Sequence, residues 1–372
     1  QVNAFNFPIW GALEKLAPAW LAGVPAIIKP ATPTAFLTEA MVRLIVDSGL
    51  VPNGALQLVC GSVSGLLDHL DGQDHVAFTG SADTAAVLRA HPTLVARSVR
   101  FNAEADSLNA AILGIAATPG TTEFDLFTSE VVREMTVKAG QKCTAIRRAL
   151  VPATQLDAVA DALATALADV RVGDPADEST QMGALVGTTQ REEVRGAVMS
   201  LRSATDVVVD ACTFHDVDPS VGAFLAPTVL RATDPTARSI HATEAFGPVC
   251  TLIGYDGPDD AIRLAALGAG SLVASVVTPD VDEAATLTLG IAAHHGRVHV
   301  LDASTAATST GHGSPLPTLV HGGPGRAGGG EEMGGLRGIR HHMQTSAIQG
   351  SPDVLTAVTG QWMPGATRHV DR

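Results

Sequence analysis

The chain has 372 residues, of which 46% are apolar and 17% are charged, so it is too apolar for a disordered segment and too weakly charged for a coiled coil. Its net charge of −14 argues against nucleic acid or an anionic membrane surface as the main partner, but still permits a local basic pocket for a phosphorylated cofactor. The four cysteines lie far apart, without a CxxC pair or zinc-like spacing, so we expect neither a disulfide scaffold nor a zinc finger. The pairs His294-His295 and His341-His342 lack the usual ligand spacing, so we expect no bound metal.

The sequence has no signal-like segment and no apolar run long enough to span a membrane, so we expect a cytoplasmic protein. It begins without Met, in what reads as the middle of a fold, and ends in a turn-rich tail that is typical of a linker. These features predict a fragment of a longer protein.

Residues 24–101 alternate between short apolar runs and stretches of helical periodicity. We predict strands over 24–29, 55–59, 76–79 and 94–101, and helices over 34–48, 64–70 and 82–91. This alternation predicts an open sheet of parallel strands joined by crossover helices. Ligands of such sheets bind beyond the carboxyl ends of the strands, here in the loops that begin at Lys29, Cys60 and Thr79.

A second α/β block follows, from about residue 104 to residue 310. We predict helices near 123–139, 156–170 and 191–202, and strands near 148–151, 249–253 and 272–277. Residues 311–350 differ, because they are rich in glycine and poor in apolar residues. The string from Gly323 to Gly328 matches the G-x-G-x-x-G dinucleotide fingerprint literally, but we reject it because we predict no strand before it and no helix after it.

Three residues stand out as candidates for chemistry. Cys143 lies in the string GQKC after a long predicted helix, beside a lysine whose charge would lower the pKa of the thiol. Glu104 directly follows a predicted buried strand, where a carboxylate can act as a general base. Asn6 lies between two phenylalanines and before a proline, and its amide could donate to an oxyanion. Taken singly, such cysteines usually fill cores, and such glutamates and asparagines usually belong to surface loops and turns.

Together these strings are more specific than any one alone. In order and spacing, Glu104 and five strings resemble the aldehyde dehydrogenase superfamily: FNFP at 5–8, KPAT at 29–32, FTGS at 78–81, GQKC at 140–143 and EAFGPV at 244–249. The Gly-rich run at 311–352 is similar to the dehydrogenase part of the bifunctional phenylacetate-degradation (PaaZ) family and to its counterpart in aerobic benzoyl-CoA degradation. In that family this part oxidises a CoA-linked semialdehyde, and a MaoC-like hydratase domain of the hotdog fold follows it.

The resemblance implies an α/β fold with an open parallel-sheet, Rossmann-type cofactor domain and an α/β catalytic domain. It divides the chain into the remainder of the cofactor domain (1–103), the catalytic domain (104–310), a Gly-rich C-terminal segment (311–352) and the start of an interdomain linker (353–372). Roughly the first third of an ordinary aldehyde dehydrogenase and the hydratase domain would lie outside this sequence. A homo-oligomer is also implied.

The same resemblance implies roles for single residues. Cys143 would attack the aldehyde, the amide of Asn6 would help to hold the oxyanion, and Glu104 would activate the water that hydrolyses the resulting thioester. Six residues would hold NADP or NAD: Lys29 and Thr32 at the adenosine ribose, Gly80 and Ser81 at the diphosphate, and Glu244 and Phe246 at the nicotinamide ribose and ring. Since NAD-specific relatives commonly carry glutamate at the position of Thr32, we expect NADP to be used at least as well as NAD.

Two departures and three alternatives stay open at this point. Glu104 is followed by Ala-Asp-Ser-Leu instead of the family's Leu-Gly-Gly-Lys, and the Gly-rich run replaces the usual Pro-Phe-Gly-Gly pattern, which favours an unusual substrate such as an acyl-CoA. A CoA-acylating dehydrogenase is one alternative, although such enzymes usually lack the glutamate base. A cofactor-free cysteine hydrolase is another, although no histidine partner for Cys143 has a local signature. The third is an inactive truncated fragment that serves only as a folded or binding module.

Overall fold

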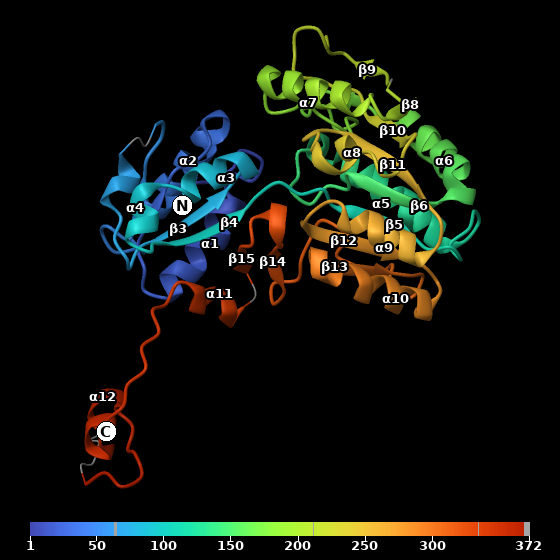
Figure 1. The fold of residues 1–372 in the computed structure, drawn as a ribbon. Coiled ribbons are helices and arrows are strands. Elements are labelled where there is room, and N and C mark those ends of the chain that lie inside the picture. Colours follow the sequence, from blue (N-terminus) through green and yellow to red (C-terminus); the bar gives the residue numbers. More distant parts are fainter. Residues whose placement is uncertain (63–64, 211, 334, 368–372) are drawn as a thin grey trace.

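The computed structural model describes residues 1–372 except 63–64, 211, 334 and 368–372. Two α/β lobes lie side by side (Figure 1). The chain passes from the first lobe to the second after strand β4 (Arg100–Glu104). It returns as a hairpin between the lobes, formed by the antiparallel strands β14 (Val320–Gly322) and β15 (Glu331–Met333).

The first lobe contains two pairs of parallel strands, β1 (Ala26–Ile28) with β2 (Leu56–Leu58), and β3 (His75–Thr79) with β4. Val2 forms isolated parallel bridges with both Lys29 and Phe78, so it links the two pairs. Helices α1 (Trp10–Leu21), α2 (Ala35–Asp47) and α3 (Ala82–Arg89) pack their apolar residues against these strands, and the 3-10 helix η1 (Thr32–Thr34) precedes α2.

The strand predicted over 94–101 is wrong in its first half. Residues Pro92–Ala96 form helix α4, and β4 begins only at Arg100. Proline at the first helical position and the side chain of His91, which accepts from the backbone N–H of Thr93 at 3.3 Å, start this helix. Glu104 is consequently the last residue of the strand instead of the residue after it. The helix predicted near 64–70 is the 3-10 helix η2 (Leu66–His69), and position 64 lies outside the described residues.

A seven-stranded sheet forms the centre of the second lobe, in the order β13-β12-β5-β6-β11-β10-β8. Its strands are β5 (Ala110–Leu113), β6 (Arg148–Pro152), β8 (Thr205–Val209), β10 (Thr228–Ala232), β11 (Val249–Tyr255), β12 (Ser271–Val277) and β13 (His295–Leu301). Every neighbouring pair is parallel except β10 with β8. Strands β5, β6 and β12 are buried along their whole length, as expected of parallel strands covered on both faces.

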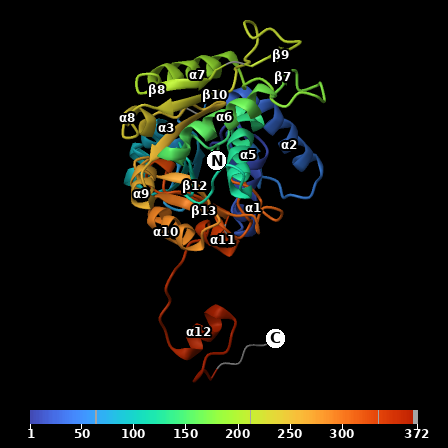
Figure 2. The ribbon, with the colours of Figure 1, turned by 90° about the vertical axis from the view of Figure 1, so that its right-hand side faces the viewer.

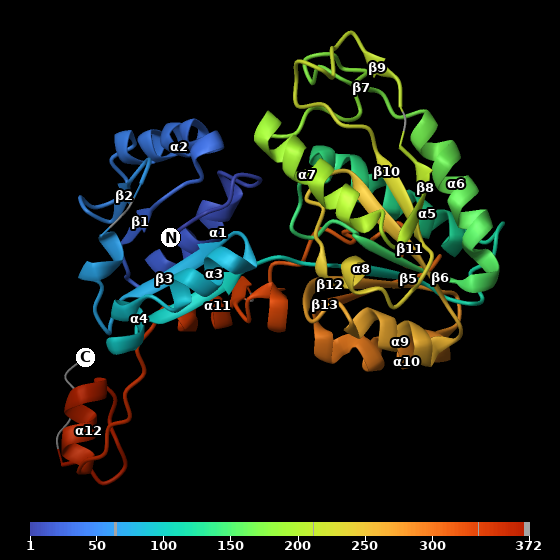
Figure 3. The same cartoon turned by 45° about the horizontal axis from the view of Figure 1, so that its top comes forward.

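Helices cover both faces of this sheet (Figure 3). One apolar core gathers residues of α5 (Thr122–Thr136), α6 (Leu156–Ala168) and α7 (Thr188–Leu201), and the other those of α8 (Arg238–Ala242), α9 (Pro258–Ala266) and α10 (Val281–Ile291). The 3-10 helices η3 (Val137–Gly140), η4 (Ala153–Gln155) and η5 (Ala292–His294) flank these helices, and β7 (Val172–Gly173) pairs with β9 (Phe214–His215) outside the sheet. The α/β fold with an open parallel sheet is confirmed.

The C-terminal segment is more structured than the sequence suggested. Strand β14 does precede Gly323, contrary to our expectation, but it pairs antiparallel with β15, and only the 3-10 helix η6 (Gly325–Ala327) follows it. A βαβ dinucleotide fingerprint is therefore rightly rejected there. Helix α11 (Leu336–His341) packs near α1, whereas α12 (Pro352–Thr359) stands apart from both lobes beyond an extended segment (Figure 2).

The predicted domain boundary at 103/104 falls within β4, and part of the predicted linker 353–372 forms α12. Residues 368–372 of that linker lie outside the described part of the chain. The division into domains stays a prediction. Among the described residues, no helix is both long and apolar enough to cross a membrane.

Candidate active site

Cys143 lies in a tight turn between α5 and β6. Directly after α5, Lys138 and Ala139 have φ angles of 56° and 51°, and Gly140 has a φ of 67°. Left-handed conformations cost non-glycine residues about 1–2 kcal/mol each, so the surroundings must hold the turn in place. A Cβ atom on Gly140 would lie 2.2 Å from the carbonyl oxygen of Gly247, so the turn packs directly on the loop that contains Gly247.

Two buried polar side chains fix this turn. Arg147 donates hydrogen bonds to the carbonyl oxygens of Gly140 at 2.9 Å and Gly247 at 2.7 Å, and so ties the two loops together. Asn109 Nδ2 donates to the carbonyl oxygen of Cys143 at 2.8 Å. The backbone that carries Cys143 is therefore held from two sides.

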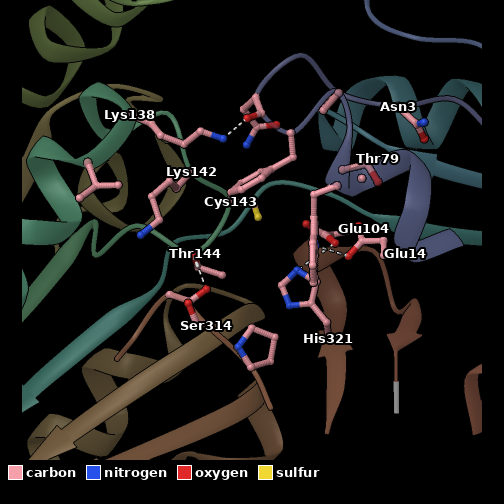
Figure 4. Close-up of a pocket in the computed structure, with 18 of the residues that line it drawn as sticks. Asn3, Glu14, Thr79, Glu104, Lys138, Lys142, Cys143, Thr144, Ser314 and His321 are labelled. Carbon is pink, nitrogen blue, oxygen red and sulfur yellow. Dashed lines mark hydrogen bonds and ion pairs between the residues drawn. The ribbon is translucent and has the colours of Figure 1, made fainter. Parts of the chain in front are cut away.

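Two cavities meet at Cys143. One, of about 380 Å³, extends past His321 and is called the His321 cavity (Figure 4). The other, of about 530 Å³, extends toward Lys29 and is called the Lys29 cavity. Six residues line both cavities: Asn3, Ala4, Asn6, Thr79, Glu104 and Cys143. Ligands bound in the two cavities would therefore meet at the sulfur.

Glu104, Cys143 and His321 form a compact cluster at this junction. A carboxylate oxygen, the sulfur and a ring nitrogen lie within 4.8 Å of one another (Figure 4). His321 Nε2 is 3.1 Å from Glu104 Oε2, the distance of an ion pair when the ring is protonated. Only 3% of Glu104 is exposed, so the interaction is shielded from water.

Burial and mutual charge shift the pKa of each member of the cluster. Burial alone would raise the pKa of Glu104, but His321 and, more weakly, Lys15 lower it to about 2. Burial lowers the pKa of His321, but the charge of Glu104 and contact with Cys143 raise it well above its ordinary value. Burial and the charge of Glu104 raise the pKa of the Cys143 thiol to about 12, whereas His321 lowers it. His321 is thus the member of the cluster that favours the thiolate.

The argument that assigned this role to Lys142 is wrong. Lys142 Nζ lies 2.7 Å from both carboxylate oxygens of Glu134, in a buried ion pair. Its charge is already balanced by that carboxylate. Among the causes of the Cys143 shift, the group that lowers the pKa of the thiol is His321, which comes from the Gly-rich segment.

A second buried ionic group lies behind Glu104. Lys15 Nζ is 2.9 Å from Glu332 and 3.1 Å from Glu14. Burial, and then the charges of Glu14 and Glu104, raise the pKa of Glu332 to about 8, although Lys15 opposes this shift. Because Lys15 already pairs with these carboxylates, they need no metal ion; the expectation of no metal anywhere in the protein stays a prediction.

Two amide side chains line the junction. Lys138 donates to the backbone carbonyl oxygen of Asn6, and its ammonium lies 3.5 Å from the centre of the Phe7 ring, which fixes the FNFP turn beside Cys143 (Figure 4). Asn3 is 4% exposed, and neither amide atom of its side chain has a hydrogen-bond partner among the described residues. Sequence reasoning singled out Asn6 and missed Asn3.

Five of the six residues predicted to hold a cofactor line the Lys29 cavity: Lys29, Gly80, Ser81, Glu244 and Phe246. The hydroxyl of Ser81 also caps α3 by accepting from the backbone N–H of Thr84 at 3.2 Å. Thr32 is the exception, because it is exposed at the start of η1 and Ala31 lines the cavity in its place.

Polar groups at the far side of the Lys29 cavity are buried and incompletely paired. Arg147 Nε is 3.5 Å from Glu244 Oε1, and Ser107 N–H donates to the other carboxylate oxygen at 3.3 Å. Burial raises the pKa of Glu244 to about 7, although Arg147 opposes the shift. Arg326 lies 3.4 Å from Asp106. Glu244 Oε1 and Arg326 Nε have no hydrogen-bond partner among the described residues, which fits a cavity that binds a polar ligand.

Cys143, the candidate nucleophile, lies where two cavities meet beside an open parallel sheet. This arrangement agrees with the resemblance to aldehyde dehydrogenases seen in the sequence. The profile of the aldehyde dehydrogenase family matches residues 1–348. The chain belongs to the aldehyde dehydrogenase family.

One relative, the 3,4-dehydroadipyl-CoA semialdehyde dehydrogenase of Aromatoleum evansii, is 51% identical over 327 residues, which cover 87% of this chain and 64% of the relative. Protein MaoC of Klebsiella aerogenes is 47% identical over 194 residues, which cover 51% of this chain and 57% of that protein.

Solved aldehyde dehydrogenases have the same fold. A variant of the betaine aldehyde dehydrogenase of Staphylococcus aureus in complex with NAD⁺ matches with a TM-score of 0.80 at 25% identity, over 92% of this chain and 66% of that one. The present aldehyde dehydrogenase chain thus spans less than two thirds of the length of these relatives.

Besides Asn3, two site residues of this aldehyde dehydrogenase chain escaped sequence reasoning, and both belong to its Gly-rich segment. His321 reaches the cysteine, and Arg326 reaches the Lys29 cavity. For His321, the one available signal was that this titratable residue directly precedes two glycines within the run that replaces the family's Pro-Phe-Gly-Gly pattern.

Proposed function

We propose that the protein catalyses the NAD(P)-dependent oxidation of a CoA-linked semialdehyde to the carboxylate. The observation that carries this proposal is that Cys143 and Glu104 lie where the His321 cavity and the Lys29 cavity meet. The substrate class is supported by the name of the 51% identical relative, a CoA-linked semialdehyde dehydrogenase. The proposed source of the semialdehyde is ring opening in aerobic phenylacetate degradation, or in the related benzoyl-CoA pathway.

A nicotinamide dinucleotide fits the Lys29 cavity, because that cavity has both a cation and buried polar atoms without partners among the described residues. Lys29 would lie at the adenosine ribose, Ser81 at the diphosphate, and Glu244 and Phe246 at the nicotinamide end. When bound, the nicotinamide ring supplies the acceptor for the hydride of the aldehyde. We expect NADP to serve at least as well as NAD, since the residue at position 32 is neutral.

In this scheme the chain's own residues do the rest. The thiolate of Cys143 attacks the aldehyde carbon, and the amide of Asn6 together with the backbone N–H of Cys143 donates to the oxyanion. Once the carbonyl is re-formed as a thioester on the sulfur, Glu104 accepts a proton from the attacking water. The low pKa of Glu104 means that this carboxylate is ionised at neutral pH, the form that the role requires.

The test is to incubate the protein with a CoA-linked semialdehyde or a simple aldehyde, with and without NADP or NAD, and to follow the absorbance of the reduced nicotinamide. Reduced cofactor formed without added CoA supports the proposal. A strict requirement for free CoA would identify an acylating dehydrogenase instead. Activity in a longer form of the protein but not in this chain would identify an inactive fragment.

A cysteine hydrolase is a second candidate, because the structure supplies the histidine partner that the sequence did not reveal. His321 and Glu104 lie beside Cys143 in an arrangement that could activate a thiol for ester or thioester hydrolysis. In the same assay, hydrolysis of a CoA thioester in the absence of any nicotinamide cofactor would favour this candidate.

We further propose that the complete protein carries a hydratase domain and forms a homo-oligomer, as in the family that the Gly-rich segment resembles, and that it is cytoplasmic. The mass of the native gene product and its elution in size-exclusion chromatography test the first two points, and cell fractionation tests the third.

A further inference from the structure

We propose that His321 is a further catalytic residue, which takes up the proton of the Cys143 thiol and holds it while the thiolate attacks the aldehyde. The inference rests on the proposed role of Cys143 as the nucleophile. In this step the S–H bond breaks and an N–H bond forms on the imidazole, so that thiol and neutral imidazole become thiolate and imidazolium. No electrons are gained or lost, and no other reactant takes part.

The position of the ring supports this role. His321 is 9% exposed, lines the same cavity as Cys143, and has a ring nitrogen within 4.8 Å of both the sulfur and the Glu104 carboxylate (Figure 4). The carboxylate on one side stabilises an imidazolium, and the sulfur on the other side provides the proton. This is the arrangement by which a neighbouring base activates a cysteine nucleophile.

The glycines around His321 explain how the ring arrives there. His321 is the middle residue of β14 and lies opposite Glu332 of β15. A Cβ atom on Gly323 would lie 2.2 Å from the carbonyl oxygen of Ser271, and one on Gly296 would lie 1.7 Å from the carbonyl oxygen of Gly322. The hairpin therefore lies directly on the backbone of β12 and β13, and only glycine allows this approach. The Gly-rich run thus positions His321.

The charges around the cluster make a cation necessary for a thiolate. The charged groups that face it come from several elements: Glu104 from β4, Glu14 and Lys15 from α1, Glu332 from β15, Arg133 from α5, Lys138 from η3, and Lys142 from the turn after η3. Lys15 and Lys142 are already paired with carboxylates, and the pKa of Cys143 is raised by burial and Glu104 and lowered by His321. A thiolate formed without transfer of its proton to His321 would add negative charge beside buried carboxylates.

Glu104 is the obvious rival as the base for the thiol. Its pKa is held near 2, chiefly by His321 against the effect of burial, so a proton shared by this pair resides on His321 and not on Glu104. The pKa of His321 is raised well above its ordinary value by Glu104 and Cys143. Of the two neighbours, the imidazole is therefore the stronger base, and the thiolate is paired with its imidazolium while Glu104 stays ionised.

The experiment measures the rate at which iodoacetamide alkylates Cys143 as a function of pH, in the full chain without substrate. The modified peptide is quantified by mass spectrometry, so that the other three cysteines do not interfere. His321→Gln should move the inflection of the profile to higher pH and slow alkylation near neutrality by about tenfold or more, the effect of one pKa unit. His312→Gln is the matched control, since His312 is a fully buried histidine of the same segment that bonds to Ser275. It should leave the profile unchanged.

A His321→Gln profile that coincides with the wild-type profile, or an equal shift in His312→Gln, would overturn the proposal. A second measurement needs no variant. In the wild-type chain, alkylation of Cys143 should lower the pKa of one histidine ring, followed by its ring nitrogen chemical shifts, because the sulfur no longer stabilises the imidazolium. Histidine titrations that are all unaffected by alkylation would also refute the role.

The outcome is separable from that of the proposed function. Alkylation requires neither aldehyde nor cofactor, so a chain that never reduces NADP can still show the His321 dependence. Conversely, turnover with an unaltered thiol profile in His321→Gln would leave the dehydrogenase proposal standing and remove His321 from the mechanism.

Discussion

Replacing Arg147 by Met should destabilise the fold strongly and disorder the Cys143 turn. Arg147 is 5% exposed, and its guanidinium donates to the carbonyl oxygens of Gly140, Lys142 and Gly247. Methionine preserves most of the side-chain volume but removes every donor. The substitution would leave three carbonyl oxygens and the Glu244 carboxyl group without their cationic partner.

The magnitude follows from these contacts. Hydrogen bonds to a charged group contribute about 1.5–3 kcal/mol each, and removing one partner of a buried ion pair costs about 3–5 kcal/mol. The variant no longer has to desolvate the charge of Arg147 on folding, and this saving offsets part of the loss of the hydrogen bonds and the ion pair. We expect the free energy of unfolding to fall by about 3–5 kcal/mol.

The loss should grow with pH. Burial holds the pKa of Glu244 at about 7, above its ordinary value of about 4.5. This shift stabilises the folded state fully below the unfolded pKa of about 4.5, and the stabilisation is lost as the pH rises through about 7. Arg147 opposes that shift. Without it the pKa of Glu244 rises further, and the pH range over which the folded state is penalised extends upward.

Urea unfolding followed by circular dichroism, at about pH 6 and about pH 8, measures both effects. Arg202→Met is the control, because the pair of Arg202 with Asp210 is 42% and 52% exposed and should contribute no more than about 1 kcal/mol. A loss below about 1 kcal/mol in Arg147→Met, similar to the control, would refute the view that Arg147 holds the two loops together.

Two further substitutions test the proposed roles directly. Glu104→Gln should lower steady-state turnover by about 10²–10⁴-fold, because it removes the base for deacylation. In rapid-mixing experiments a single-turnover burst of reduced cofactor should survive, and an acyl group should accumulate on Cys143. Unchanged steady-state turnover would exclude Glu104 from the mechanism. Thr32→Glu should shift the ratio of kcat/KM for NADP and NAD toward NAD by about tenfold or more, since a carboxylate repels a 2′-phosphate. No shift would show that Thr32, which is exposed at the start of η1, does not contact the cofactor.

The sequence was sufficient for the fold class, for the family and for the convergence of several motifs on one site. Glu104, Cys143 and Asn6 lie in short strings whose order is typical of the family, and each string maps to one turn or strand end. Local information failed at residues 92–96, where an apolar run is compatible with either strand or helix and the proline start signal decided in favour of the helix.

The electrostatics of the site could not be read from the sequence, because they depend on contacts between distant segments. Lys142 is adjacent to Cys143 in the chain but pairs with Glu134, whereas His321 arrives from a hairpin whose course is set by glycine contacts with β12 and β13. Sequence proximity therefore suggested the wrong cation. The clamp by Arg147 was missed for the same reason, since it joins two loops that are distant in sequence.

The central claim is that Cys143 forms a covalent intermediate during nicotinamide-dependent oxidation of a CoA-linked semialdehyde. Its most direct test compares the wild-type chain with Cys143→Ser. With semialdehyde and NADP, the wild type should generate reduced nicotinamide and, after acid quenching, carry the acyl group on the peptide that contains Cys143. Cys143→Ser should do neither, because a serine hydroxyl has no comparable ionised population at neutral pH. Cys250→Ser, at a buried core cysteine, is the control and should retain activity. Equal rates of cofactor reduction in the wild type and Cys143→Ser would contradict the account.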